Sequence, residues 1–247
     1  EVYNAGVRSY SPIIYWRKLK HLIETKQFSF NEVILCIDLS DLADILNYQE
    51  DKKQNIITIK TKQAKKSRRF SFRKLIRNIH IKNKGHSTLY KIVFKFVEKF
   101  FELPSYLKRT YGLLWKNTRW AISPDTFKVE RLKGLEKLKK YMNKTLKLLN
   151  KYNIKLRLVV YPHPDQIKNH SLNHIHVTYW KEWAKKTNTT FLNLFPSFIN
   201  KKYKALGWRK IIPQYFIPGD IHWNKKGHKK VAKEILNSFS KNIHPKI

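Results

Sequence analysis

Three scarcities limit what this chain of 247 residues can be. It has one cysteine, Cys36, so a framework of disulfides within the chain is excluded, although the compartment stays open. It has no apolar run long enough to cross a bilayer as a helix. Acidic residues number only 17 against 52 lysines and arginines, which gives a formal net charge of +35.

The charge has two interpretations, and the sequence leaves both open. A strongly cationic surface suits a polyanionic partner, such as an anionic membrane, an acidic polysaccharide or a nucleic acid. Alternatively, AT-rich codons supply the lysines, because the chain is also rich in Asn, Ile, Phe and Tyr and has only 7 glycines. No RNA-recognition signature, zinc-finger spacing or basic heptad run is present, so we expect no nucleic-acid partner.

What the chain does have is an alternation of apolar runs and amphipathic stretches. Hydrophobic residues make up 42% of the sequence, which is enough for a packed core. The alternation predicts an α/β fold with a mainly parallel sheet. The expected elements are a strand at 1–7, a helix at 11–24, strand 33–37, helix 123–153, strand 154–162, helix 176–188, strand 189–196 and a closing helix at 223–239. Trp180 and Trp183 are expected in the core.

We expect a single domain over 1–247 with a basic, partly helical insertion at about 50–122. The insertion is marked by dense Lys and Arg and by a mixed pattern, with a candidate hairpin at Ile56–Ile59. Residues 87–102 form an amphipathic pattern, which predicts a helix packed on the domain or lying on a membrane surface.

Polar clusters follow the predicted strands, where ligands bind in parallel sheets. They lie at 4–11, 38–44, 161–165 and 219–222. His163 and Asp165 offer two metal ligands without a third, and the flanking prolines favour a rigid loop instead. His170, His174 and His176 are expected to be solvated.

The most specific cluster is Asp220-Ile221-His222, which comes just before the closing helix. A carboxylate on one ring nitrogen fixes the tautomer that a general base needs. The alternative is a surface Asp–His pair with no catalytic role. Trp223, the predicted helix cap Asn224 and the following Gly-His favour the catalytic interpretation.

With NAGVRSYSP at 4–12, IDLSDLAD at 37–44 and GDIHWNKKGH at 219–228, the chain resembles the SGNH (GDSL-like) hydrolase and acyltransferase superfamily. The resemblance implies a three-layer α/β/α fold with a flavodoxin-like, mainly parallel sheet. It also implies an active site built from four sequence blocks. The first block carries a nucleophilic Ser on the first strand, the second and third supply the oxyanion hole, and the last carries the catalytic Asp and His.

Carried over to this sequence, His222 is the implied base and Asp220 its partner, one residue closer than the usual Asp-x-x-His, which would put Gly219 at the acid position. Ser9 stands where the family has its oxyanion Gly, and Ser40 replaces the oxyanion Asn. The Asp-x-His-Trp version is similar to the alginate-acetyltransferase-like branch, in which polysaccharides are O-acetylated.

The nucleophile is the gap in this resemblance. No Gly-Asp-Ser occurs in the 247 residues, and the only Gly-Asp is Gly219-Asp220. We therefore expect that the first strand and its Ser are missing from the sequence. Ser9 and Ser11 are the substitutes that the sequence offers, but both belong to the oxyanion side of the implied site.

The resemblance implies an esterase or O-acyltransferase that acts on an acylated, most simply acetylated, carbohydrate or another small ester. It implies no cofactor and no metal, and it favours the bacterial cell envelope or periplasm. The alternative is a non-catalytic SGNH-like protein that binds an anionic glycan or membrane surface through its basic insertion. A nucleic-acid binder rests on charge alone. The oligomeric state is left open.

Overall fold

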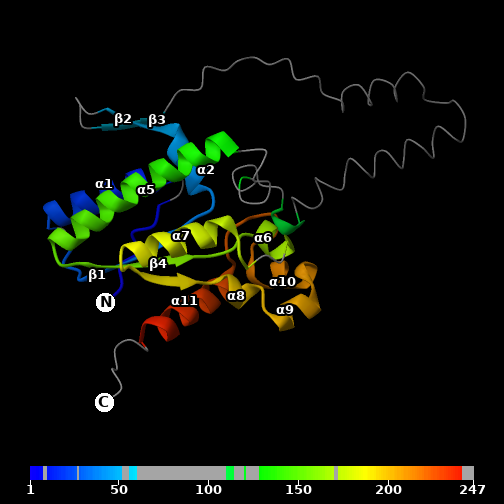
Figure 1. The fold of residues 1–247 in the computed structure, drawn as a ribbon. Helices are drawn as coiled ribbons and strands as arrows, with labels where there is room; N and C mark the ends of the chain where they lie inside the picture. Colours follow the sequence, from blue (N-terminus) through cyan, green and yellow to red (C-terminus); the bar gives the residue numbers. More distant parts are fainter. Residues whose placement is uncertain are drawn as a thin grey trace, which may run out of the picture.

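Three parallel strands form the central sheet of the protein. The computed structural model describes residues 1–7, 10–26, 28–51, 56–59, 110–113, 120, 128–169 and 172–240. The strands are β1 (Glu32–Ile37), β4 (Lys155–Val160) and β5 (Thr190–Asn193), and they lie in the order β1-β4-β5 (Figure 1). The predicted α/β class with a parallel sheet is therefore confirmed.

The register of the sheet brings the polar strand ends to one edge. Ile37 pairs with Val160, and Val160 pairs with Asn193, so the three strands end level with one another. Because the strands are parallel, the residues that follow them share the carboxyl edge of the sheet. This edge holds the polar clusters that the sequence places after 37 and after 160.

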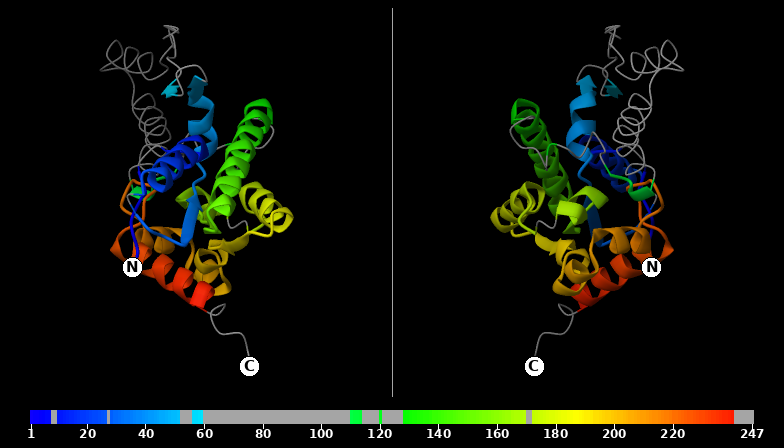
Figure 2. Two further views of the ribbon diagram at one scale, coloured as in Figure 1. Left: turned by 90° about the vertical axis from the view of Figure 1, so that its left-hand side faces the viewer. Right: turned by 90° about the vertical axis from the view of Figure 1, so that its right-hand side faces the viewer.

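Helices cover the sheet on both faces. α1 and α2 pack against α5, α7 packs along β4 and β5, and α11 lies across the opposite face (Figures 1 and 2). The short helices gather near the carboxyl edge of the sheet (Figure 1). The helices are α1 (Pro12–Glu24), α2 (Asp41–Asn47), α5 (Lys128–Lys151), α6 (Pro164–Asn169), α7 (Ile175–Lys186), α8 (Phe195–Phe198), α9 (Lys201–Leu206), α10 (Trp208–Tyr215) and α11 (Lys225–Ser240).

The face that carries α11 is only partly covered. The guanidinium carbon of Arg157 in β4 lies 4.3 Å from the ring centroid of Phe239 in α11, so this side chain points to that face. Ile34 of β1 pairs with Arg157 and points the same way, because paired strand residues share a face. Ile34 is nevertheless 42% exposed. Among the described residues, α11 therefore leaves this side of β1 open.

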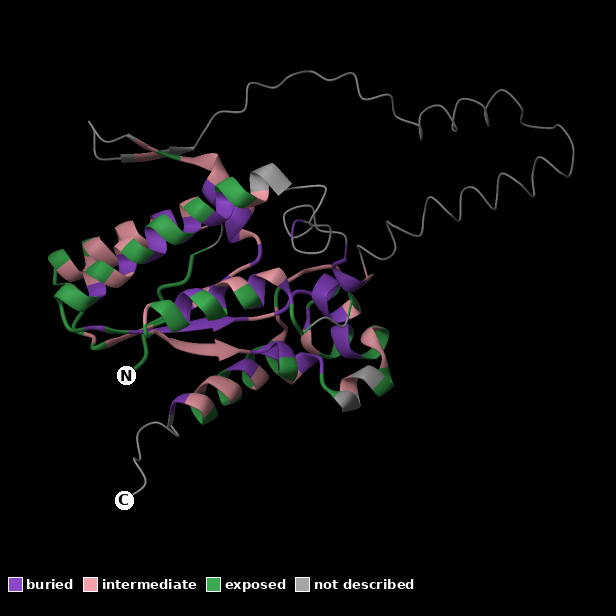
Figure 3. Cartoon of the chain, viewed as in Figure 1, coloured by how far each residue is buried: buried purple, intermediate pink, exposed green. Residues whose placement is uncertain are grey.

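The buried apolar residues form one core cluster, which includes residues of α5 and α7 and also of α8, α10 and α11 (Figure 3). Trp180 is fully buried and Trp183 nearly so, which confirms their predicted place in the core. In α5, Leu135, Leu138, Met142 and Leu149 are buried, whereas Leu132 is 52% exposed. The helix therefore packs on the core from Leu135 onward.

The predicted strand at 1–7 is wrong. These residues form no strand, and Val2 is 93% exposed. An isolated extended segment leaves its backbone N–H and C=O groups without the ladder that stabilises a strand. No described strand lies beside this segment, so its apolar residues have nothing to pair with.

Part of the predicted insertion is a small hairpin. β3 (Ile56–Ile59) is the expected strand, and it pairs antiparallel with β2 (Tyr48–Asp51), away from the central sheet. The predicted amphipathic helix at 87–102 and most of the insertion at 50–122 lie outside the described residues. Within the part of the chain that the structure describes, no helix is long and apolar enough to cross a membrane.

Asn224 begins the closing helix as the sequence predicts. Its Oδ1 accepts the backbone N–H of Gly227 at 3.0 Å, while its Nδ2 donates to the carbonyls of Gln214 and Phe216 at 3.2 Å. We predict that Asn224→Ala lowers the free energy of unfolding by about 1–2 kcal/mol, because a helix cap and two loop contacts are lost. Urea unfolding measures this change.

Asn237→Ala is the matched control, because Asn237 is exposed on the same helix. It should change the unfolding free energy by less than about 0.5 kcal/mol. Equal losses in the two variants would contradict the capping role of Asn224.

Candidate functional site

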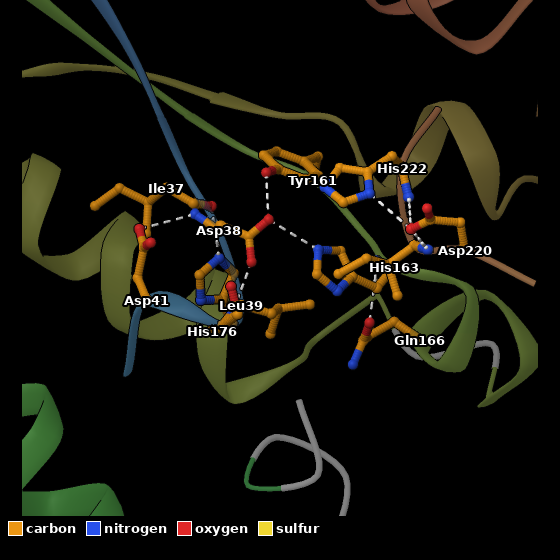
Figure 4. Close-up of polar contacts among 12 residues, drawn as sticks. Ile37, Asp38, Leu39, Asp41, Tyr161, His163, Gln166, His176, Asp220 and His222 are labelled. Atoms are coloured by element: carbon orange, nitrogen blue, oxygen red, sulfur yellow. Dashed lines mark hydrogen bonds and ion pairs between the residues drawn. The ribbon is translucent and has the colours of Figure 1, made fainter. Parts of the chain in front are cut away.

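The candidate site lies at the carboxyl edge of the sheet, where three loops meet. Asp38 follows β1, Tyr161 and His163 follow β4, and the loop that carries Asp220 and His222 precedes α11 (Figure 4). Asp38 and Tyr161 are 123 positions apart in the chain, and the parallel pairing of β1 with β4 brings them together.

Asp220 and His222 form the pair that the sequence predicts. The Nδ1 of His222 lies 2.6 Å from Oδ1 of Asp220. A carboxylate only accepts hydrogen bonds, so Nδ1 carries the proton and Nε2 of the neutral ring is left with its lone pair. The His222 side chain is 63% exposed, so Nε2 is open to a reacting group.

One intervening residue is enough for this pair because Asp220 also folds the loop. Its Oδ1 accepts the backbone N–H of Ile221 at 2.6 Å and that of His222 at 3.2 Å, which curls the chain around the carboxylate. Gly219 supplies the turn with a φ of 74°, in the region that favours glycine. The loop is closed at its base by the bridge between Phe216 and Trp223.

The same hydrogen bonds keep Asp220 ionised. Partial burial alone would raise the pKa of this carboxyl, but the hydrogen bonds from His222 and from the backbone outweigh it and lower the pKa below its ordinary value. A charged carboxylate on Nδ1 favours the imidazolium form of His222 whenever the ring accepts a proton at Nε2.

A second acid–imidazole contact lies deeper in the edge. Oδ2 of Asp38 accepts the hydroxyl of Tyr161 at 2.5 Å and contacts Nε2 of His163 at 3.0 Å, while Oδ1 accepts the backbone N–H of Ser40 at 2.6 Å (Figure 4). Burial would raise the pKa of Asp38, but attraction to His163 and the three hydrogen bonds hold it well below the ordinary value.

Asp41 is the neighbouring carboxyl and behaves in the opposite way. It is buried and accepts the hydroxyl of Tyr15 at 3.0 Å and the backbone N–H of Asp38 at 3.1 Å. Burial, together with the negative charge of Asp38, raises the pKa of Asp41 well above its ordinary value. The start of α2 therefore holds two carboxyl groups whose pKa values are shifted in opposite directions.

An aromatic contact connects the two acid–imidazole pairs. The ring of Tyr161 lies 4.7 Å from the ring of Trp223, which directly follows His222 in the chain. Ser40 is thus linked to the base loop through Asp38, Tyr161 and Trp223. Three of the four predicted site residues, Ser40, Asp220 and His222, belong to one connected edge.

The remaining serines have different outcomes. Ser9 lies outside the described residues. Ser11 is fully buried, and its hydroxyl has no hydrogen-bond partner among the described residues. A serine acts as a nucleophile only when a base contacts its hydroxyl, so the surroundings of Ser11 do not suit that role.

The metal reading of His163 and Asp165 is replaced by a structural one. Nε2 of His163 contacts Asp38. The backbone N–H of His163 donates to Oε1 of Gln166 at 3.0 Å, a hydrogen bond at the start of α6. Among the described residues, no group of three or more His, Cys, Asp or Glu side chains is arranged to hold a metal ion.

The prediction that His174 and His176 are solvated is wrong, and His170 lies outside the described residues. His176 is 1% exposed, and its Nε2 contacts the carbonyl of Ile37 at 3.3 Å. Burial lowers the pKa of His176 to about 3 and that of His174 to about 4. The missed signal is that His176 belongs to the buried face of α7, together with Val177, Trp180 and Trp183.

No family model matches this chain, and neither do curated proteins or solved structures.

The buried His176 makes the stability of the protein depend on pH. Its folded pKa of about 3 lies below the ordinary 6.5, so the unfolded chain binds more protons between these values. We predict that the wild type loses stability relative to His176→Gln as the pH falls from about 6.5 to 4, by up to ~1.4 kcal/mol per pH unit. Unfolding in urea at each pH measures the difference.

His21→Gln is the matched control, since His21 is exposed on α1. For this variant, a plot of the free energy of unfolding against pH should run parallel to that of the wild type. A His176→Gln curve that is also parallel to the wild type would show that His176 titrates normally in the folded protein.

Proposed function

We propose that the protein is an SGNH-type serine esterase or O-acyltransferase that acts on an acylated carbohydrate. The observation that carries the proposal is the 2.6 Å hydrogen bond between Asp220 and His222 at the carboxyl edge of a parallel sheet. That pair, its place before the last helix and the β1 loop with Ser40 agree with the arrangement of the superfamily that the sequence resembles.

The proposed fold is the three-layer, flavodoxin-like arrangement with strand order 2-1-3-4-5. In it, β1, β4 and β5 correspond to the third, fourth and fifth strands, with α11 on the face opposite α5 and α7. The first strand would then pair with the second edge of β1, to which no described strand is bonded. The nucleophilic Ser of the proposed enzyme would stand at the end of that first strand, beside Asp38 and facing His222.

The chemistry follows from the free Nε2 of His222. The Ser Oγ attacks the carbonyl carbon of the ester while Nε2 takes the hydroxyl proton, and Asp220 stabilises the resulting imidazolium. Collapse of the tetrahedral intermediate breaks the bond to the sugar oxygen, which takes the proton back from Nε2. Water or a second sugar hydroxyl then attacks the acyl-serine by the same route in reverse.

Ser9 and Ser40 are proposed to stabilise the oxyanion, through the backbone N–H of Ser9 and the hydroxyl of Ser40. The Ser40 N–H donates to Asp38, and the Ser40 side chain hydrogen-bonds to Asp44, so the hydroxyl would have to turn away from Asp44 to reach the oxyanion. A hydroxyl is shorter than the Asn amide usual in the family, and a weakened donor of this kind typically costs about 10²–10³ in rate. We therefore propose a slow enzyme.

We predict that His222→Ala lowers turnover of an acetyl ester by about 10³-fold or more in the protein as its gene encodes it, because the proton acceptor is lost. Asp220→Asn should also reduce turnover strongly, since the amide no longer favours the imidazolium. Initial rates on a chromogenic acetyl ester measure both.

His21→Ala removes an exposed imidazole from α1 and should leave the rate unchanged. Unchanged turnover in His222→Ala would remove the proposed function. Circular dichroism of each variant separates loss of the base from loss of the fold.

A further inference from the structure

We propose that Lys168, Trp208 and Arg209 form a binding site for an anionic group of the glycan, next to the Asp220–His222 pair. The inference deepens the proposed function, on which the identity of the ligand as a glycan rests. The three residues are called the cationic platform below. Lys168 lies in the last turn of α6, and the other two are the first residues of α10.

A short chain of contacts places the platform beside the catalytic pair. The segment at Gly112 lies directly against the Asp220 loop, because a Cβ on Gly112 would be 2.1 Å from the backbone oxygen of Asp220. The adjacent Tyr111 meets Trp208, with ring centroids 5.0 Å apart. The platform is therefore one aromatic side chain away from the backbone that holds His222.

Within the platform, two cations share one indole ring. The guanidinium carbon of Arg209 lies 4.5 Å from the ring centroid of Trp208, and Nζ of Lys168 lies 5.7 Å from it. A guanidinium stacked on an aromatic ring keeps its N–H edge free for a carboxylate or phosphate. Among the described residues, neither cation forms an ion pair with an acidic side chain.

A second group of cations follows the catalytic loop in the chain. Lys225 and Lys226 are exposed in the first turn of α11, directly after the loop, and that turn contains no acidic residue. The helix dipole disfavours cations at an N-terminus. These lysines therefore do not stabilise the helix that carries them, whereas an anionic ligand at the loop would gain from them.

The ligand class follows from this arrangement. Cations on the helices that come before and after the loop of an acid–imidazole pair fit a polymer that presents anionic groups at intervals and an ester between them. A uronate carboxylate and a sugar or polyol phosphate share this chemistry. A nucleic-acid duplex would need a continuous basic surface and gives no reason for the cations to lie on the helices before and after the loop of His222.

The test is binding, measured by calorimetry at about 0.15 M salt. The probes are a short oligogalacturonate, its fully methyl-esterified form, a polyol phosphate of matched charge and a DNA duplex. The variants are Lys168→Gln with Arg209→Gln, and the control Lys181→Gln with Lys185→Gln, which removes the same charge from exposed positions of α7. Arg209→Lys keeps the positive charge and removes the planar guanidinium that can donate two parallel hydrogen bonds.

We expect the platform variant to bind oligogalacturonate or polyol phosphate about tenfold more weakly or worse, because charge-assisted hydrogen bonds are lost. The control should change affinity less than about twofold. The probe that responds to the platform identifies the anion as carboxylate or phosphate, and the esterified form should bind weakly. Arg209→Lys should fall between the wild type and the double variant.

Equal weakening in the two double variants would overturn the inference, because it would reveal unspecific polyelectrolyte binding. Binding of the duplex alone, or of none of the probes, would overturn it too. The measurement requires no turnover, so it separates the two claims: platform-dependent binding without esterase activity would remove the proposed function only. Esterase activity with unchanged binding in the platform variant would remove this inference only.

Discussion

The carboxylate of Asp38 is the constraint on which the candidate site depends. It ends β1, accepts the Tyr161 hydroxyl and contacts His163 from the end of β4, and it fixes the Ser40 backbone at the start of α2. The ring of Tyr161, which Asp38 holds, packs against Trp223 in the loop of His222, so Asp38 also helps to position that loop. Because burial raises the cost of leaving such a charge unpaired, the partners of Asp38 are held in one arrangement.

The site therefore has a buried interior and an exposed rim. Asp41, His163 and His176 are buried and the Asp38 side chain is 22% exposed, whereas the His222 side chain is 63% exposed. This is the arrangement that general-base chemistry on a large substrate needs: a fixed orientation at Nδ1 and free access at Nε2. The cations of α10 and of the first turn of α11 would then orient an anionic polymer at the exposed imidazole.

Much of this could be predicted from the sequence, because local patterns determine it. The apolar run at 33–37 predicted β1, and Asp220 and His222 are close enough in the chain to pair by local folding. What failed depends on distant partners. Residues 1–7 have the composition of a strand but no neighbour, and His176 is buried by contact with Ile37, 139 positions earlier in the chain. The contacts of Asp38 with Tyr161 and His163 likewise depend on the register between β1 and β4. The spacing of these residues along the chain does not reveal that register.

The central claim is that His222 activates a serine carried on a strand beside the free edge of β1. It is tested most directly by treating the protein, as its gene encodes it, with a fluorophosphonate and locating the adduct by mass spectrometry. The account predicts one labelled serine on a strand outside the 247 residues, with labelling lost in His222→Ala. Labelling at Ser9 or Ser11, labelling that persists without His222, or no adduct at all would contradict it.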